Sequence, residues 1–253
     1  MKPLILITND DSIEAPGLHR LVEIAAEFGD VIAVAPKYPQ SGQSSAISVE
    51  KPLRINQTDD YCGARMFTVS GTPVDCVKLA LNAIVPRHPD LLLSGINHGS
   101  NSGNAITYSG TMGAVLEGCT NGIVSVGFSL CHHSIKADFS LSAPLVRDIV
   151  GRVLANGLPD YTALNVNIPA RVVPAGSKVC RAARGHWSEE FVRYTDPAGK
   201  PFYMLSGRFV NEEPDMTDTD EYWLSQGYVS VVPVTPDQTA ARYIESLSQT
   251  FTI

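Results

Sequence analysis

The chain opens with a short aliphatic run, residues 4–7, that soon meets Asn9 and two adjacent carboxylates, Asp10 and Asp11. Such a run followed by turn-forming residues predicts a buried parallel strand, whose carboxyl end delivers polar side chains to one edge of the sheet. Ligands of open α/β sheets bind at that edge. Two ionised Asp side chains in a partly enclosed site repel each other and favour a hard cation between them. On this segment alone the alternative stays open that Asp10 or Asp11 only caps a helix beginning near Gly17.

Apolar runs and helical patterns alternate along the first two thirds of the chain. Thr72 is expected to cap a helix, with Pro73 in its first turn. The remaining spacing predicts helices over 18–28, 73–84, 112–119 and 141–154, and strands over 31–35, 47–55, 66–69, 89–97, 124–130 and 163–168. This alternation predicts an α/β fold with a doubly wound, mostly parallel sheet.

The sequence changes character beyond Pro169, where Gly, Pro and charged residues dominate and 229–234 is the clearest strand candidate. We therefore expect one domain over 1–253, made of a core over 1–169 and a smaller, irregular extension over 170–253. An arm in this extension is a candidate for packing on a partner chain.

Composition limits the function classes. The 253 residues, 44% of them hydrophobic, can bury the core of one large α/β domain. A formal net charge of −7 disfavours a surface for duplex nucleic acid. The five cysteines are an odd number without a CxxC pair, which favours buried thiols in a reducing cytoplasm. Neither a signal peptide nor a membrane-spanning run is recognised, so we expect a cytoplasmic protein with no membrane partner.

Oxygen-bearing side chains recur where strands are expected to end. Besides Asp10 and Asp11, Ser41 lies in the polar loop after the second strand and Asn97 ends the run 89–97. Parallel strands bring their carboxyl ends to one edge, so these side chains can meet around one ion. Carboxylate, hydroxyl and amide oxygens suit Mg²⁺ or Mn²⁺. Taken singly, Ser41 could be a turn residue and Asn97 a helix cap or loop hydrogen-bonder.

A Gly-, Asn- and Ser-rich loop leads into Ser109, Gly110 and Thr111 at the expected start of a helix. Hydroxyls and free backbone N–H groups at a helix N-terminus bind anions, which makes this segment a phosphate-site hypothesis. The sequence lacks a GxxxxGK[ST] loop, a GxGxxG after its first strand and a GxSxG elbow. His98, beside Asn97, is either a proton donor or a bystander.

The segments that carry this chemistry occur in an order that resembles the SurE family of survival-protein nucleotidases. The matching runs are Ile7-Thr8-Asn9-Asp10-Asp11, Ala15-Pro16-Gly17, Ala35-Pro36, Ser41-Gly42, Ser70-Gly71-Thr72-Pro73, Asp75-Cys76-Val77, Ser94-Gly95-Ile96-Asn97 through Asn101, Tyr108-Ser109-Gly110-Thr111, Glu117-Gly118, Asn165-Val166-Asn167-Ile168-Pro169 and Gly227-Tyr228-Val229-Ser230. They span most of the chain, which makes the match more specific than any single motif.

The resemblance implies a Rossmann-like core and a metal-dependent phosphomonoesterase that acts on nucleoside 5′-monophosphates and often on 3′-monophosphates. Some members of the family also shorten polyphosphate. It further implies a homodimer or homotetramer with one divalent metal ion per subunit, Mg²⁺ or Mn²⁺. By the same implication the metal ligands are Asp10, Asp11, Ser41 and Asn97, and Ser109, Gly110 and Thr111 lie near the phosphate.

These implications suggest a mechanism in which Asp10 and Asp11 are the catalytic residues, because they hold the cation that activates water for in-line attack. Asn9 would join Ser109–Thr111 in stabilising charge on the equatorial oxygens. A covalent role for Asp10, as in phosphatases with DxD after the first strand, is not matched, because the second acid is adjacent and Ser12 stands two residues on.

Two departures from the family pattern keep an alternative open. Ser12 stands where the family usually has Gly, and Asn104 and Ala105 lie where it usually carries an acid. Ser12 could restrict the backbone, and the missing acid could weaken support around the metal. The alternative is a catalytically weakened nucleotide-binding module of the same fold.

Overall fold

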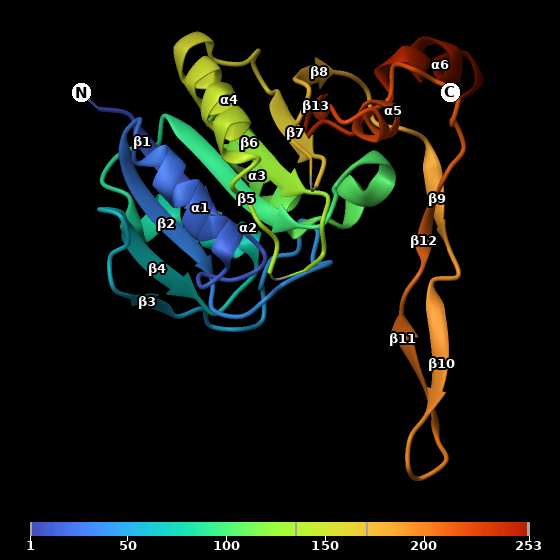
Figure 1. Cartoon of the computed structure of the whole chain (residues 1–253), viewed down its shortest axis with the longest axis horizontal. Helices are drawn as coiled ribbons and strands as arrows, with labels where there is room; N and C mark the ends of the chain where they lie inside the picture. The colour runs from blue at the N-terminus through green and yellow to red at the C-terminus, as the bar shows by residue number, and fades with distance from the viewer. Residues whose placement is uncertain (1, 135, 171, 252–253) are drawn as a thin grey trace.

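The computed structural model describes residues 2–134, 136–170 and 172–251. Over these residues nine strands form one sheet in the order β3-β4-β2-β1-β5-β6-β7-β13-β8 (Figure 1). The strands are β1 (Leu4–Thr8), β2 (Asp30–Pro36), β3 (Ile55–Gln57), β4 (Arg65–Val69), β5 (Leu91–His98), β6 (Val124–Leu130), β7 (Ala163–Ile168), β8 (Ser177–Val179) and β13 (Val229–Val234).

The middle of this sheet is parallel, from β4 through β2, β1, β5 and β6 to β7. Antiparallel pairs occur toward its edges, between β3 and β4 and between β13 and β7. From β1 the sheet continues through β2 and β4 in one direction, and from β5 it continues through β6 and β7 in the other. The predicted doubly wound α/β sheet is therefore confirmed, and its topological switch point lies between β1 and β5.

Helices cover both faces of the sheet. Figure 1 shows α1 (Pro16–Ala25) and α4 (Ala143–Asn156) in front of it, with α2 (Pro73–Leu79) and α3 (Gly110–Thr120) behind. Alternate β1 side chains enter the two cores: Ile5 and Ile7 join the core under α1 and α4, and Leu4 and Leu6 join the other. Because both faces are covered, β1 is a continuous apolar run.

Local signals placed the parallel strands and the helix starts well. The strands expected over 124–130 and 163–168 have those bounds in the structure. Thr72 caps α2 as predicted: its hydroxyl accepts from Asp75 N at 3.1 Å, and its N–H donates to the Asp75 carboxylate at 2.9 Å. This reciprocal capping satisfies two backbone donors that the helix leaves open.

The strand expected over 47–55 was wrong, because only Ile55 of that run belongs to β3. The backbone before it bonds to the cap of α2 instead of to a strand ladder. Ser48 N donates to Asp75 Oδ1 at 3.0 Å, and the Thr72 hydroxyl donates to Ala46 O at 2.6 Å. The alternating Ile47 and Val49 side chains that suggested a strand are exposed.

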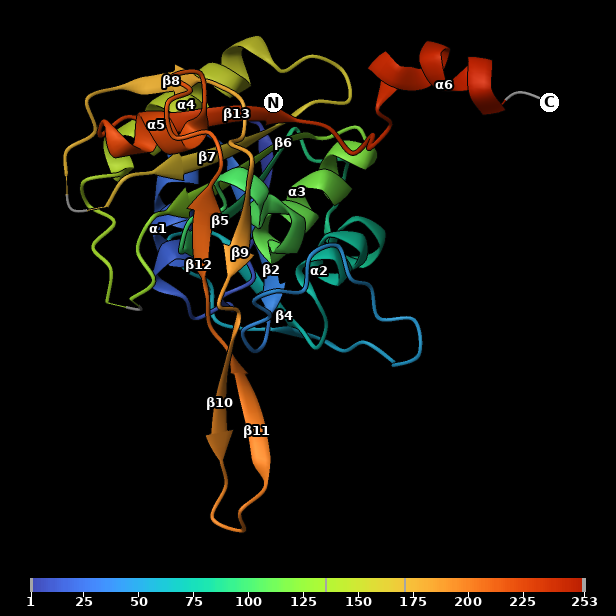
Figure 2. The ribbon, with the colours of Figure 1, turned by 90° about the vertical axis from the view of Figure 1, so that its right-hand side faces the viewer.

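The C-terminal part contributes to the main sheet and also leaves it. The strand expected over 229–234 is β13, beside β7 and β8. Between β8 and β13 the chain forms a long two-stranded arm that projects from the body (Figure 2). The arm pairs β9 (Gly185–Ser188) with β12 (Arg208–Asn211) and β10 (Phe191–Thr195) with β11 (Pro201–Leu205). It is followed by α5 (Asp220–Ser225) and, beyond β13, by α6 (Ile244–Phe251).

The burial of the cysteines and the length of the apolar helices can be compared with the sequence expectations. Cys76 and Cys119 are buried as expected, but Cys62 is exposed and Cys131 and Cys180 are half-buried. Cys62 lies in the tight turn before β4, outside both cores. Among the residues that the structure describes, no helix is both long and apolar enough to cross a bilayer.

Candidate active site

The two strands at the switch point carry three of the four predicted metal ligands. Asp10 and Asp11 follow the end of β1, and Asn97 lies near the end of β5. The pairing of β5 with β6 shifts register between Ser94 and Asn97, and Gly95 there has a φ of 121° that favours glycine. An irregularity of this kind re-aims the side chains that follow it. Asn97 and His98 follow this irregularity, and His98 reaches Asp11.

Asp10 is buried against the N-terminus of α3. The Thr111 hydroxyl donates to Asp10 Oδ1 at 2.6 Å, and a Cβ added to Gly110 would lie 3.0 Å from Oδ2. Burial raises the pKa of Asp10 to about 6, and the neighbouring Asp11 charge adds to this, although the Thr111 hydrogen bond opposes it. A buried carboxylate beside a second one is costly to ionise without a positive partner.

Asp11 is held by His98 from the neighbouring strand. Both the backbone N–H and the Nδ1 of His98 bond to Asp11 Oδ2, at 3.0 and 2.9 Å. The His98 side chain is only 8% exposed, and its ring packs edge-on against Phe139. Because Nδ1 donates to a carboxylate, the proton of a neutral imidazole is assigned to that nitrogen. His98 is therefore an orienting residue for Asp11.

The loop that carries Ser41 is anchored on both sides. Gln40 N donates to the backbone oxygen of Asp10 at 2.7 Å, and Ser44 N donates to Tyr108 O at 3.1 Å. The Ser44 hydroxyl also donates to Thr107 O at 2.7 Å. Ser41 follows directly on the Asp10 contact, but its side chain is exposed and makes none of the contacts described for the two carboxylates. Its role as a ligand remains a prediction.

Asn9 supports the turn that carries the two carboxylates. Its buried side chain donates from Nδ2 to Ser12 O at 2.8 Å. Ser12 has a φ of 94°, the left-handed region that glycine favours, so the backbone conformation expected of Gly at this position is retained by Ser. Asn9 Oδ1 is buried without a partner among the described residues. A direct contact of Asn9 with phosphate remains a prediction.

Ser109, Gly110 and Thr111 form the start of α3 at the site. Ser109 is the N-cap, and its hydroxyl accepts from Met112 N at 3.1 Å. Thr111 donates to Asp10, and Gly110 allows the helix backbone to approach the same carboxylate. A helix N-terminus favours an anion such as phosphate, because its first N–H groups are free and its dipole is positive there. The structure brings this segment to Asp10, and its contact with phosphate stays a prediction.

The donor set suits a hard divalent cation. The hydrogen bonds above engage Oδ1 of Asp10 and Oδ2 of Asp11, and Asn97 donates from Nδ2 to Gly99 O at 2.9 Å. The other carboxylate oxygens and the Asn97 amide oxygen are the atoms that fit a cation, and all are hard oxygen donors. Among the described residues no three His, Cys, Asp or Glu side chains are grouped as a metal site. A cation here would use amide, hydroxyl or water oxygens besides the two carboxylates.

A network of buried amides fixes the loop after Asn97 and was not foreseen from the sequence. Asn101 N donates to Asn167 Oδ1 at 2.7 Å, and Asn165 Nδ2 donates to Asn101 O at 2.8 Å. The Asn101 side chain donates to Ser129 Oγ at 2.7 Å. The two Asn residues of β7 thus hold a loop more than sixty positions away. The only signal in the sequence was the two-residue spacing of Asn165 and Asn167, which places both side chains on one face of β7.

The fold and the site together define a doubly wound α/β protein with a paired-carboxylate site at its switch point. Residues 5–189 match the family model described as survival protein SurE, so the chain belongs to the SurE family. It is 49% identical to the 5′-nucleotidase SurE of Christiangramia forsetii over 98% of this chain and 96% of that protein. The 5′-nucleotidase SurE of Phocaeicola vulgatus is 46% identical, with 97% and 96% covered.

A solved structure agrees with this assignment. The crystal structure of the SurE protein from Aquifex aeolicus matches with a TM-score of 0.83 and 37% sequence identity. The match covers 98% of this chain and 99% of that one. The family resemblance derived from the sequence motifs is therefore confirmed, and the fold is shared over nearly the full length.

Proposed function

We propose that this chain is a 5′-nucleotidase that hydrolyses nucleoside 5′-monophosphates to a nucleoside and phosphate. The observation that carries the proposal is the hydrogen bond of Asp10 to Thr111 at the N-terminus of α3, next to Asp11, which His98 of β5 holds. The names of the relatives support the reaction class. The finer expectations, that 3′-monophosphates and short polyphosphate are also substrates, belong to the same proposal.

One divalent cation per subunit, Mg²⁺ or Mn²⁺, completes the proposed site, held by Asp10, Asp11, Asn97 and Ser41. When bound, such a cation supplies Lewis-acid polarisation of the phosphate and activation of a water molecule. The residues of the chain would provide the rest of the chemistry. Asp10 and Asp11 place negative charge where the cation is needed, and His98 holds one of them in a single orientation.

The start of α3 would bind the phosphate. Its first N–H groups and the positive end of its dipole favour the equatorial oxygens, whose charge must be stabilised during in-line displacement. Gly110 allows the start of α3 to lie close to Asp10, because a side chain at position 110 would collide with this carboxylate. Asn9 supports the turn that carries Asp10 and Asp11 by donating a hydrogen bond to the Ser12 carbonyl. The catalytic residues are thus Asp10 and Asp11, with Asn9, Ser109, Gly110 and Thr111 as phosphate contacts.

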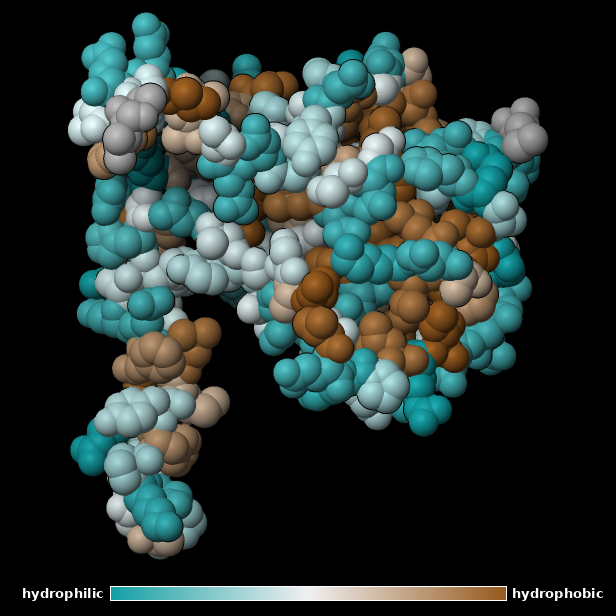
Figure 3. Space-filling view, turned by 180° about the vertical axis from the view of Figure 1, so that it is seen from behind, coloured by the Kyte–Doolittle hydropathy of each residue, from teal (hydrophilic) through white to brown (hydrophobic). Residues whose placement is uncertain are grey.

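The proposal includes a homodimer or homotetramer assembled through the arm. Figure 3 shows apolar side chains along the projecting arm. Phe191, Leu205 and Met204 are more than half exposed, and an apolar hollow of about 410 Å³ lies along β10 and β11. A second copy that covers this surface would remove the cost of exposing it to water.

We also place the enzyme in the cytoplasm. The five cysteines are free thiols, and one of them, Cys62, is exposed, which suits a reducing compartment. Fractionation of cells that express the chain, followed by detection beside a cytoplasmic marker, tests this placement. Recovery outside the cytoplasmic fraction would contradict it.

The decisive experiment measures phosphate release from nucleoside 5′- and 3′-monophosphates and short polyphosphate, with Mg²⁺, Mn²⁺ or EDTA. We expect release with metal, no release with EDTA, and loss of turnover in Asp11→Asn. Asp59→Asn, which changes an exposed carboxylate between β3 and β4, is the matched control and should behave as wild type. Well-folded protein that binds nucleotides but releases no phosphate with either metal would favour the binding-module alternative.

A further inference from the structure

The loop that joins the two halves of the site is bonded to the base of the arm. We define the site loop as residues 99–108 and the arm root as residues 181–185 and 211–221. Three consecutive residues of the site loop bond to the C-terminal part: the Ser102 hydroxyl to Glu221, Gly103 N to Asp220, and the Asn104 amide to Gly185 O. The partner residues lie 81 to 119 positions farther along the chain than the loop residues that they bind.

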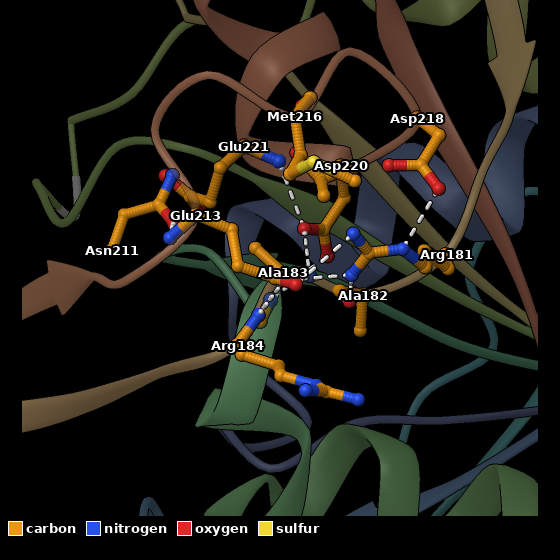
Figure 4. Close-up of polar contacts among 12 residues, drawn as sticks. Arg181, Ala182, Ala183, Arg184, Asn211, Glu213, Met216, Asp218, Asp220 and Glu221 are labelled. Atoms are coloured by element: carbon orange, nitrogen blue, oxygen red, sulfur yellow. Dashed lines mark hydrogen bonds and ion pairs between the residues drawn. The ribbon is translucent and has the colours of Figure 1, made fainter.

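Asp220 is the centre of this junction. Its side chain is fully buried. Oδ2 accepts from Gly103 N at 2.8 Å, and Oδ1 accepts from Ala183 N and Glu221 N, each at 2.8 Å. Figure 4 shows the carboxylate between the strand that enters the arm and the helix that follows it. Three backbone donors from three segments make these charge-assisted hydrogen bonds a single fixed joint.

Close packing around Gly103 reinforces the joint. Gly103 has a φ of 51°, and a Cβ on it would lie 2.7 Å from Cζ of Phe209, a residue of β12. The site loop therefore lies directly against the first strand pair of the arm. Asn104 adds a second bond to that pair. A carboxylate at position 104 could not donate to the Gly185 carbonyl, so this contact depends on the amide present here.

The arm root is itself tied together by ion pairs. The Arg181 guanidinium bonds to both carboxylate oxygens of Glu213, at 2.7 and 3.2 Å, and to Asp218 at 2.9 Å. Glu213 also accepts from Arg184 N at 2.8 Å. These contacts join the segment that leads into β9 to the segment that follows β12 (Figure 4). A displacement of the arm would therefore be transmitted to Asp220 rather than absorbed in a loose hinge.

At its other end the site loop leads into the catalytic elements. It directly follows His98, the last residue of β5, and Ser109, the cap of α3, comes immediately after it. Thr111 in the first turn of α3 holds Asp10. A shift of the site loop would move the ligand-bearing end of β5 relative to the phosphate-binding end of α3. A misplacement of about 1 Å in such a site can cost on the order of a hundred-fold in rate.

We infer that Asp220 is a positioning residue of the active site: it fixes the site loop on the arm root, so that the geometry of the site depends on the placement of the arm. This inference rests on the proposed nucleotidase function for its kinetic part only. Assembly through the arm is then coupled to catalysis, because the same root that carries the apolar arm also holds Gly103.

The test compares Asp220→Asn with Asp218→Asn. The amide is isosteric but cannot accept on both sides of the joint, whereas Asp218 pairs with Arg181 in the same root and is more than half exposed. The first measurement is hydrogen–deuterium exchange in metal-free protein. We expect exchange in residues 99–108 to rise roughly ten-fold in Asp220→Asn, with β6 unchanged, and to stay at the wild-type rate in Asp218→Asn.

The second measurement separates turnover from binding. With p-nitrophenyl phosphate and Mn²⁺, we expect kcat to fall roughly ten-fold or more in Asp220→Asn with a smaller change in KM, because positioning acts mainly in the transition state. If wild-type protein also releases no phosphate from nucleoside 5′-monophosphates, the proposed function fails, and the exchange data and Mn²⁺ affinity still decide the positioning role.

Two results would overturn the inference. One is a folded Asp220→Asn protein whose site loop exchanges as in wild type. The other is an equal response in Asp218→Asn, since that would reflect general loosening of the arm root. If Asp220→Asn does not fold, Asn104→Ala decides the matter, because it removes a partly buried contact of the same junction without touching Asp220. Faster exchange in residues 99–108 of that variant supports the coupling, and unchanged exchange contradicts it.

Discussion

His98 and Asp11 lie 87 positions apart and are joined by two hydrogen bonds to one carboxylate oxygen. The backbone bond belongs to the strand end, but the ring bond depends on the histidine side chain. Together they leave the second oxygen of Asp11 to face the proposed cation. Residues that orient metal ligands in this way commonly contribute as much to affinity as a weak ligand does.

We predict that His98→Phe lowers the affinity for Mn²⁺ about ten-fold or more. The phenyl ring keeps the packing on Phe139 and the backbone bond but loses the donor to Asp11. His98→Asn, whose amide nitrogen can take the place of Nδ1, should recover most of the affinity. Titration followed by electron paramagnetic resonance of free Mn²⁺ measures this without reference to turnover. Wild-type affinity in the Phe variant would refute the orienting role.

Gly110→Ala should strongly impair catalysis while the fold survives. The new Cβ would lie 2.9 Å from Cβ and 3.0 Å from Oδ2 of Asp10, so the carboxylate or the helix must shift. We expect kcat to fall on the order of a hundred-fold. Gly151→Ala in α4, where the nearest atom is a ring carbon of Phe28 at 3.3 Å, is the control. Equal activity in both variants would argue against close apposition of α3 and Asp10.

Ser12→Gly should stabilise the protein by about 1 kcal/mol. Ser12 holds a φ of 94°, which costs a non-glycine residue about 1–3 kcal/mol, whereas added flexibility of the unfolded chain offsets about 0.4–1 kcal/mol. Urea unfolding measures the free energy directly. Ser45→Gly, at a position without a left-handed φ, should be neutral or destabilising. A less stable Ser12→Gly protein would show that the serine side chain compensates for the strain.

Glu221→Gln tests the electrostatics of the arm root. Burial raises the pKa of Glu221, and the Asp220 charge raises it further, although the Ser102 hydrogen bond lowers it. In the range between the unfolded and folded pKa values the native state binds more protons, so wild-type stability falls as pH rises through the folded pKa.

The variant lacks this titration. We therefore expect it to be at least as stable as wild type near pH 8, with the difference shrinking as the pH falls through the folded pKa of Glu221. Thermal unfolding of both proteins over the same pH series isolates this group from the other carboxylates, which titrate in both. A difference that grows on acidification would contradict the sign of the pKa shift.

The apolar arm should determine the oligomeric state. Phe191 and Leu205 are cross-strand partners on the arm and are 64% and 74% exposed. The double variant Phe191→Ser, Leu205→Ser should shift the mass measured by light scattering toward the monomer, because covering this pair drives association. Lys200→Ser, near the tip of the same hairpin, should leave the mass unchanged. An unchanged mass in the double variant would exclude the arm as the interface.

Much of the fold was predictable because its signals are local. The apolar run of β1, the Thr72 cap and the strand over 163–168 each depend on residues close in sequence. The strand prediction over 47–55 was wrong because it used local signals alone. The alternation of the run resembled a strand, but the backbone there forms hydrogen bonds with Asp75 and Thr72 instead of with a neighbouring strand. A local sequence pattern does not reveal which residues distant in sequence will form hydrogen bonds with the same backbone groups.

The position of Asp10 and Asp11 at the end of a strand could be predicted from the sequence, but the residues that hold their side chains could not. Asp10 and Asp11 end a recognisable buried strand, so the strand edge and the site were foreseeable. Thr111 holding Asp10, and His98 holding Asp11, are long-range contacts that depend on how α3 and β5 pack. Asp220 gave no signal at all, because its partners are backbone N–H groups of other segments.

The sequence by itself determined the α/β alternation, the family and the carboxylate pair, since hydrophobic period, capping and motif order are written into neighbouring residues. Only the tertiary structure decided which oxygens of Asp10 and Asp11 are engaged, and that the site loop rests on the arm root through Asp220. The physical reason is that hydrogen bonds between segments more than eighty positions apart exist only after the sheet has brought those segments together.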